Sequence, residues 1–74
     1  ASFVSAKELG ALISKFLQHE KKNERAIFLR RYWFFDSLTE ISTRFGFSES
    51  KIKSILWRQR SRLKDFLKKE GFDI

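Results

Sequence analysis

Apolar positions recur along this chain at the three- and four-residue spacing that is typical of amphipathic helices. Near the N-terminus, Ser5 and Glu8 have the spacing of a capping box, which predicts that a helix starts there. The apolar positions of this helix form one stripe: Leu9, Leu12, Ile13, Phe16 and Leu17. The polar run from His19 to Asn23 interrupts the pattern, and Asn23 followed by Glu24 indicates the cap of a second helix.

The second predicted helix, from Glu24 to Phe35, carries more large apolar side chains than one narrow stripe can hold. These residues are Ile27, Phe28, Leu29, Tyr32, Trp33, Phe34 and Phe35. We therefore expect it to be the central and most buried helix of the fold.

A short third helix is predicted between two clear signals. Ser37 and Glu40 repeat the capping-box spacing, and Gly46 is the residue type that closes helices in the left-handed conformation. Small Ser42 stands where a following helix would cross. The last helix has Ser48 as its cap.

This last helix is expected to run to about Lys69, before Gly71 stops it. At 100° per residue, one of its faces is apolar with Gln59 among the apolar residues, and the opposite face is polar. The stretch from Leu38 to Trp57 thus has the layout of a helix-turn-helix. The predicted core comprises Leu9, Leu12, Ile13, Phe16, Phe28, Leu29, Ile41, Phe45, Ile52, Ile55, Leu56 and Leu63.

Composition narrows the class of protein. The 74 residues suffice for one domain, and the absence of Cys excludes disulfides and thiolate chemistry and favours a reducing, intracellular setting. No apolar run exceeds four residues, whereas a membrane span needs about 20, and no signal peptide is recognisable, so we expect a cytoplasmic protein with no membrane contact. Sixteen Lys and Arg against nine Asp and Glu give a net charge of +7, which makes nucleic acid the foremost partner.

The basic charge is concentrated on the last helix. Residues 51 to 64 contain six basic residues and no acid, which indicates phosphate contact. Lys53 is able to donate to guanine, Ser54 to pair with several base edges, and Trp57 to cover a thymine methyl group or stack on the backbone. Arg58 is a candidate for a base or a phosphate, and Ser50, Lys51 and Arg60 complete the predicted DNA-binding set. The alternatives are that Trp57 packs on a neighbouring helix or a partner protein, and that Ser54 is plain solvated surface.

A second candidate phosphate contact lies at the start of the third helix. Ser37 and the backbone N–H groups of Leu38 and Thr39 stand at a helix N-terminus, where ordinary capping is the alternative role. Arg30, Arg31 and Arg44 either add phosphate contacts or only solubilise the surface.

The stretch from Glu24 to Leu67 resembles region 4 of the sigma-70 family of bacterial RNA polymerase sigma factors. It is most similar to the extracytoplasmic-function type. The matching residues are Arg25, Phe28, Arg31, Tyr32, Glu40, Ile41, Gly46, Ser48, Ile52, Lys53, Ser54, Arg58 and Arg60. Ser42 departs from the usual Ala, and Trp57 is bulkier than the common Phe or Ala.

The resemblance implies transcription initiation by recognition of the minus-35 promoter element as duplex DNA, with docking on the β flap of RNA polymerase core. It implies that the positions of Lys53, Ser54, Trp57 and Arg58 contact bases and backbone, and that Ser37 and Leu38 meet phosphate. An anti-sigma factor that covers this surface would be a further partner. The expected fold is a single all-α domain over residues 1–74, of four helices, with a winged-helix-like or sigma region 4 architecture. Its helix-turn-helix spans about 38–57 and its recognition helix about 48–69.

Two rival functions remain open at this point. One is a free-standing helix-turn-helix regulator that binds palindromes as a dimer, whereas we expect a monomer. The other is a protein-interaction module whose aromatic second helix docks a partner. An enzyme is the weakest reading, because the single His, His19, lies in a polar linker without a metal-ligand partner, so no cofactor, metal or catalytic residue is expected.

Overall fold

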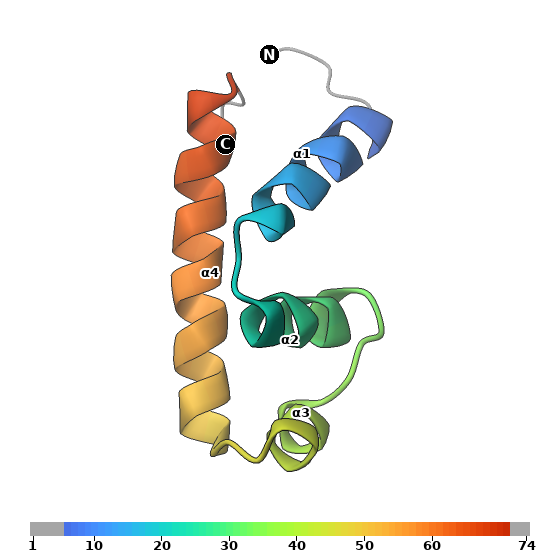
Figure 1. Ribbon diagram of the computed structural model, residues 1–74, viewed down its shortest axis with the longest axis vertical. Helices are drawn as coiled ribbons and strands as arrows, with labels where there is room; N and C mark the ends of the chain where they lie inside the picture. The colour runs from blue at the N-terminus through green and yellow to red at the C-terminus, as the bar shows by residue number, and fades with distance from the viewer. Residues whose placement is uncertain (1–5, 72–74) are drawn as a thin grey trace.

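The computed structural model describes residues 6–71, which form four helices and no strand. The helices are α1 (Ala6–Gln18), α2 (Lys22–Tyr32), α3 (Leu38–Phe45) and α4 (Glu49–Lys69). The long α4 runs the length of the domain, and α1, α2 and α3 are stacked along one side of it (Figure 1). The expected all-α class with four helices is confirmed. With no strand, residues 6–71 contain no β-hairpin that would form a wing.

The third and fourth helices begin and end where the sequence predicts, because their signals are local. The Ser37 hydroxyl accepts the Glu40 N–H at 3.1 Å, and the Glu40 carboxylate accepts the Ser37 N–H at 3.2 Å, which completes the capping box. Gly46 closes α3 with a φ of 71°. Ser48 caps α4 by accepting the Lys51 N–H at 3.1 Å. The predicted cap of α1, Ser5, lies outside the described residues.

The predicted start of the second helix is wrong by two residues. Lys21 is the N-cap of α2, with extended backbone and no side-chain cap, and Asn23 lies within the helix. The Arg25 guanidinium donates to the carbonyl oxygens of Leu17 at 2.9 Å and Glu20 at 3.2 Å. These bonds satisfy carbonyl groups at the end of α1 and in the turn, so the turn is fixed from within α2 rather than by an Asn cap.

The predicted end of the second helix is also wrong, because α2 stops at Tyr32 rather than Phe35. The chain turns away through Phe35, whose φ is 58°, a conformation that bulky residues rarely adopt. As a result Trp33 and Phe35 are 73% and 84% exposed and Phe34 is also exposed, so the aromatic end of this segment is not buried. Arg30 and Arg31 hold this turn: Arg30 lies 3.9 Å from the Asp36 carboxylate, and Arg31 donates to the Asp36 carbonyl at 3.1 Å.

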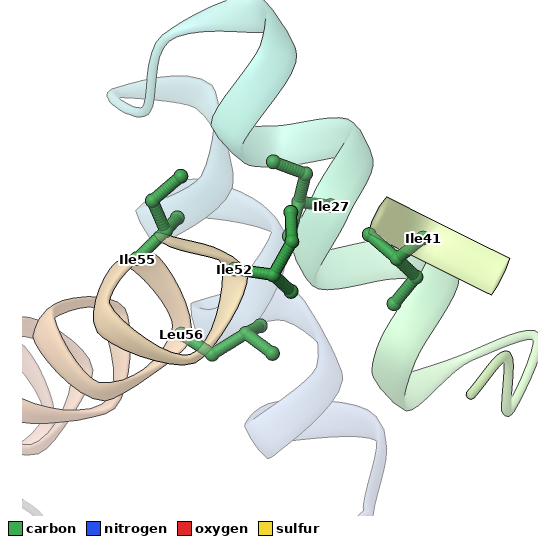
Figure 2. Packing of buried hydrophobic residues seen from close by; sticks show 5 residues of the cluster. All are labelled: Ile27, Ile41, Ile52, Ile55 and Leu56. Atoms are coloured by element: carbon green, nitrogen blue, oxygen red, sulfur yellow. The ribbon is translucent and has the colours of Figure 1, made fainter. Parts of the chain in front are cut away.

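The core is divided into two clusters along α4. The isoleucine cluster joins α2, α3 and α4, and its side chains point toward one another (Figure 2): Ile27, Ile41, Ile52, Ile55 and Leu56. The phenylalanine cluster joins α1 and α2 to the other end of α4, and consists of Phe16, Leu17 and Phe28 with Ile13, Leu29, Leu63 and Phe66 packed on it. The isoleucine cluster therefore fixes the α3–α4 arrangement, and the phenylalanine cluster attaches α1.

Most of the predicted core is confirmed as buried or half-buried, with one error. Leu9 is 36% exposed, because α1 slants away from α4 toward its N-terminal end (Figure 1). Leu17, Ile27 and Leu67 were not in the predicted core, yet all three are buried. Gln59 lies on the apolar face of α4 as predicted and is fully buried, where its Nε2 donates to the Glu24 carbonyl at 2.6 Å.

Candidate nucleic-acid interface

The polar face of α4 is open to solvent over its whole predicted DNA-binding set: Ser50, Lys51, Lys53, Ser54, Trp57, Arg58 and Arg60. Trp57 is 63% exposed, so among the described residues it does not pack on a neighbouring helix. Ile52, Ile55 and Leu56 lie between these positions in the sequence and form the opposite face of α4, which packs against α2 and α3. Burial of one face therefore fixes which side chains α4 presents.

At 100° per residue, the six basic residues of the 51–64 stretch divide between the two edges of the exposed face of α4. One edge carries Lys53, Arg60 and Lys64, and the other carries Lys51, Arg58 and Arg62. The strip between the edges holds Trp57 with Ser50, Ser54 and Ser61. Cations thus flank a central strip of one aromatic and several small hydroxyl side chains.

Five of these predicted residues come together in one shallow hollow of about 540 Å³. Its lining consists of Lys53, Ser54, Trp57, Arg58 and Arg60. We call it the basic hollow. It brings three cations, one hydroxyl and one indole ring to a single surface site, which suits an anionic and partly aromatic ligand.

Most of the positive charge on this face is not neutralised within the protein. Arg62 pairs with the mostly buried carboxylate of Glu20 at 2.6 Å, which holds α4 to the turn between α1 and α2. Among residues 6–71, the other five basic residues of the 51–64 stretch form no ion pair: Lys51, Lys53, Arg58, Arg60 and Lys64. The Lys51 ammonium lies 4.0 Å from the centre of the Phe47 ring, a cation–π contact that places it at the start of α4 without cancelling its charge.

The start of α3 is a separate location. Ser37 lines a second shallow hollow with Thr39, Glu40, Thr43 and Arg44. No residue of this hollow also lines the basic hollow on α4. The capping role of Ser37 is confirmed, and the hydrogen bonds from Ser37, aided by Arg44, hold the pKa of Glu40 below its usual value. This carboxylate occupies the Ser37 N–H that a phosphate would otherwise use. The side chain of Leu38 packs against the isoleucine cluster, which leaves only its backbone N–H for an anion.

Two polar contacts fix α3 against the start of α4. The Thr39 hydroxyl donates to the Glu49 carboxylate at 3.3 Å, and the Ser42 hydroxyl donates to the carbonyl of Phe47 in the connecting turn. Ser42 is therefore more than a small residue at a crossing, because it satisfies a carbonyl of the turn. The exposed face of α4 is held in a fixed orientation relative to α3.

Two features of the surface were not predicted from the sequence. An apolar groove of about 520 Å³ lies between α1, α2 and α4, and is lined mainly by Ile13, Leu17, Phe28, Leu29, Tyr32, Trp33 and Leu63. Arg60 lines this groove as well as the basic hollow, and its Nη1 donates to the Tyr32 hydroxyl at 3.0 Å. Tyr32 and Arg60 are 28 residues apart and lie on different helices. The periodicity within one helix does not predict a contact between two helices, so no signal in the sequence pointed to this bond.

No protein-family model matches this chain, and no curated protein matches it at a significant level. Among the described residues, no helix is both long and apolar enough to cross a membrane. Residues 6–71 also contain no group of three or more His, Asp or Glu side chains placed to hold a metal ion.

Proposed function

We propose that this chain is a sequence-specific DNA-binding domain in which α3 and α4 act as a helix-turn-helix, and that it serves a sigma factor in promoter recognition. The observation that carries the proposal is the exposed face of α4, with unneutralised cations on both edges and hydroxyl and indole groups between them. An α-helix about 10–12 Å in diameter fits the major groove of duplex DNA, which is about 12 Å wide. Cations on both edges of such a helix face the two phosphate backbones, and the central strip faces the bases.

The assignment to a sigma factor rests on the resemblance of residues 24–67 to region 4 of the sigma-70 family. On this proposal the target is a minus-35 element bound as duplex DNA by a monomer. Ser54 and Trp57 lie on the central strip toward the base edges. Lys53 lies on one edge, but in the N-terminal part of α4 that enters the groove, where its long side chain reaches a base. Arg58 and Arg60 lie toward phosphate. The position of Ser37 and Leu38 at the start of α3 supports a weaker phosphate contact, because Glu40 already occupies the Ser37 N–H.

Selection from a library of short random duplexes at two salt concentrations tests this function, with the molecular mass of the complex measured in parallel. We expect one unsplit motif, bound by a monomer, with an affinity that falls steeply as salt rises. A palindrome bound by a dimer would instead establish the free-standing regulator. The absence of any enrichment or salt dependence would favour the protein-interaction module and would refute DNA recognition by this chain.

Single substitutions separate base reading from phosphate contact. Lys53→Ala should lower binding to the selected motif by about 1–3 kcal/mol and relax preference at one position, whereas Arg60→Ala should weaken all sequences alike. Lys7→Ala is a matched control, because Lys7 is an exposed lysine on α1, away from the α4 face, and its loss removes the same charge. Equal losses for Lys53→Ala on every sequence would remove its base-reading role.

The same proposal includes the β flap of RNA polymerase as protein partner, and the apolar groove as its docking surface. The groove is open, mostly apolar and lined by α1, α2 and α4, as the docking of an apolar protein segment requires. Trp33→Ala should weaken capture of a purified β flap fragment, because Trp33 lines the groove. Phe35→Ala is the matched control, since Phe35 is a similarly exposed aromatic residue that does not line the groove. Equal capture by both variants and the unaltered chain would place the flap elsewhere.

A further inference from the structure

We propose that Tyr32 is a positioning residue for nucleic-acid binding, whose hydroxyl holds the Arg60 guanidinium at the basic hollow. This inference rests on the proposed DNA-binding function. Arg60 is exposed on α4, and its Nη1 donates to the Tyr32 hydroxyl at 3.0 Å. Since Arg60 also lines the basic hollow with Lys53, Trp57 and Arg58, the bond connects the end of α2 to the predicted phosphate site.

The Tyr32 hydroxyl is a firm anchor because its ring is held by the core. Tyr32 is the last residue of α2, and its ring lies on Phe28 with the centroids 4.8 Å apart and the planes tilted by 52°. Phe28 is buried, and its ring lies against the ring of Phe16, with the two centroids 6.4 Å apart. A continuous series of aromatic contacts thus runs from the phenylalanine cluster to the hydroxyl that Arg60 meets.

This anchor leaves Arg60 fully able to bind an anion. A guanidinium has five N–H donors, so one bond to Tyr32 leaves the others free for phosphate. The phenolic oxygen is a neutral acceptor and does not cancel the positive charge, in contrast to the carboxylate of Glu20 that pairs with Arg62. A long side chain that is already ordered also loses less conformational entropy when a ligand binds.

Arg58 provides the internal comparison. It lines the same hollow, but no residue among 6–71 accepts a hydrogen bond from its guanidinium or forms an ion pair with it. Arg58 and Arg60 are therefore two arginines at one site, of which one is anchored. A substitution of Tyr32 should affect the contribution of Arg60 and leave that of Arg58 unchanged.

A double-mutant cycle on the full 74-residue chain tests the inference. Tyr32→Phe removes the hydroxyl and keeps the ring that packs on Phe28. Dissociation constants for the selected duplex and for a scrambled duplex are measured by fluorescence anisotropy. Tyr32→Phe should weaken binding to both by about two- to tenfold, the cost of ordering one long side chain. In an Arg60→Ala background, Tyr32→Phe should change nothing, whereas in an Arg58→Ala background its full effect should persist.

The outcomes distinguish this inference from the proposed function. If the unaltered chain binds no duplex, DNA recognition is refuted and the positioning role is refuted with it. If the unaltered chain binds and Tyr32→Phe binds equally well, only the positioning role is refuted. An identical loss in the Arg60→Ala background would also overturn it, because the hydroxyl would then act by another route. Urea unfolding of each variant verifies that the losses come from binding. Arg60→Gln keeps a planar N–H donor but removes the charge, so it tests the Tyr32–Arg60 pair without altering Tyr32.

Discussion

Gln59 is a fully buried amide in the middle of an apolar helix face, and its replacement makes a sharp test of the core. Its Nε2 donates to the Glu24 carbonyl at 2.6 Å, but its Oε1 has no hydrogen-bond partner among the described residues. The Glu24 carbonyl lies in α2, where the helix supplies it with an N–H four residues later, so it keeps a partner when Gln59 is replaced.

Gln59→Met keeps an unbranched side chain of similar length and removes both the NH₂ and the C=O of the amide. The substitution loses one hydrogen bond, which lowers the free energy of unfolding by about 1 kcal/mol. It also removes one buried unpaired acceptor, which raises the free energy of unfolding by about 1–3 kcal/mol. We therefore expect Gln59→Met to raise the free energy of unfolding by about 1 kcal/mol. Gln59→Ala leaves a cavity and should be about 2–5 kcal/mol less stable than Gln59→Met.

Urea unfolding at neutral pH, followed by circular dichroism, measures these differences in a domain whose total stability is about 5 kcal/mol or a little more. The unaltered chain and both variants are compared at equal protein concentration. If Gln59→Met proved less stable than the unaltered chain by 1 kcal/mol or more, the amide would be a net stabilising group. The reasoning that its Oε1 carries a desolvation cost would then be refuted.

Two further predictions concern local features of the fold. Phe35→Gly should stabilise the domain by about 0.5–1 kcal/mol in thermal unfolding, because it relieves the positive φ of an exposed side chain at a smaller cost in unfolded-state entropy. Phe34→Gly, which removes the ring 4.6 Å from the Arg30 guanidinium, should destabilise the domain instead. Stability changes of the same sign for the two substitutions would contradict backbone strain at Phe35. The lowered pKa of Glu40 means that the folded state holds this carboxylate ionised more readily than the unfolded state does. Its contribution is complete above the usual Glu pKa of about 4.3 and is lost as the pH falls through the lowered value, so the stability advantage over Glu40→Gln should shrink between neutral and acid pH. An advantage that stays constant down to pH values below this range, in urea unfolding series, would contradict the assignment.

The sequence predicts α3 and α4 well because their boundaries depend on groups a few residues apart. The capping box of Ser37 and Glu40, the left-handed Gly46 and the cap Ser48 each act within one turn of a helix. The polar face of α4 is equally predictable, because the periodicity of its buried residues determines which side chains remain outside.

The errors lie where tertiary contacts decide. In the second helix seven large apolar residues compete for burial, and only packing against α4 selects Ile27 and Phe28 over the exposed Trp33 and Phe35. Leu9 follows the apolar stripe of α1 but is exposed, because the N-terminal end of α1 slants away from α4 (Figure 1). The contact between Tyr32 and Arg60 joins two helices, so it depends on the way the helices pack and does not follow from the sequence pattern of either helix.

The length of α4 has a mechanical consequence. Its 21 residues span about 31 Å in one unbroken helix, against a long dimension of 40 Å for the domain, and it contributes to both core clusters. Because a helix of this kind tilts as one body, a tilt of about 10° at one end displaces the other end by about 5 Å. A small change in packing beside α1 would therefore move the first turn of α4, together with the α3 that is fixed to it, by more than the rise of about 3.4 Å of one base-pair step, without any hinge within α4.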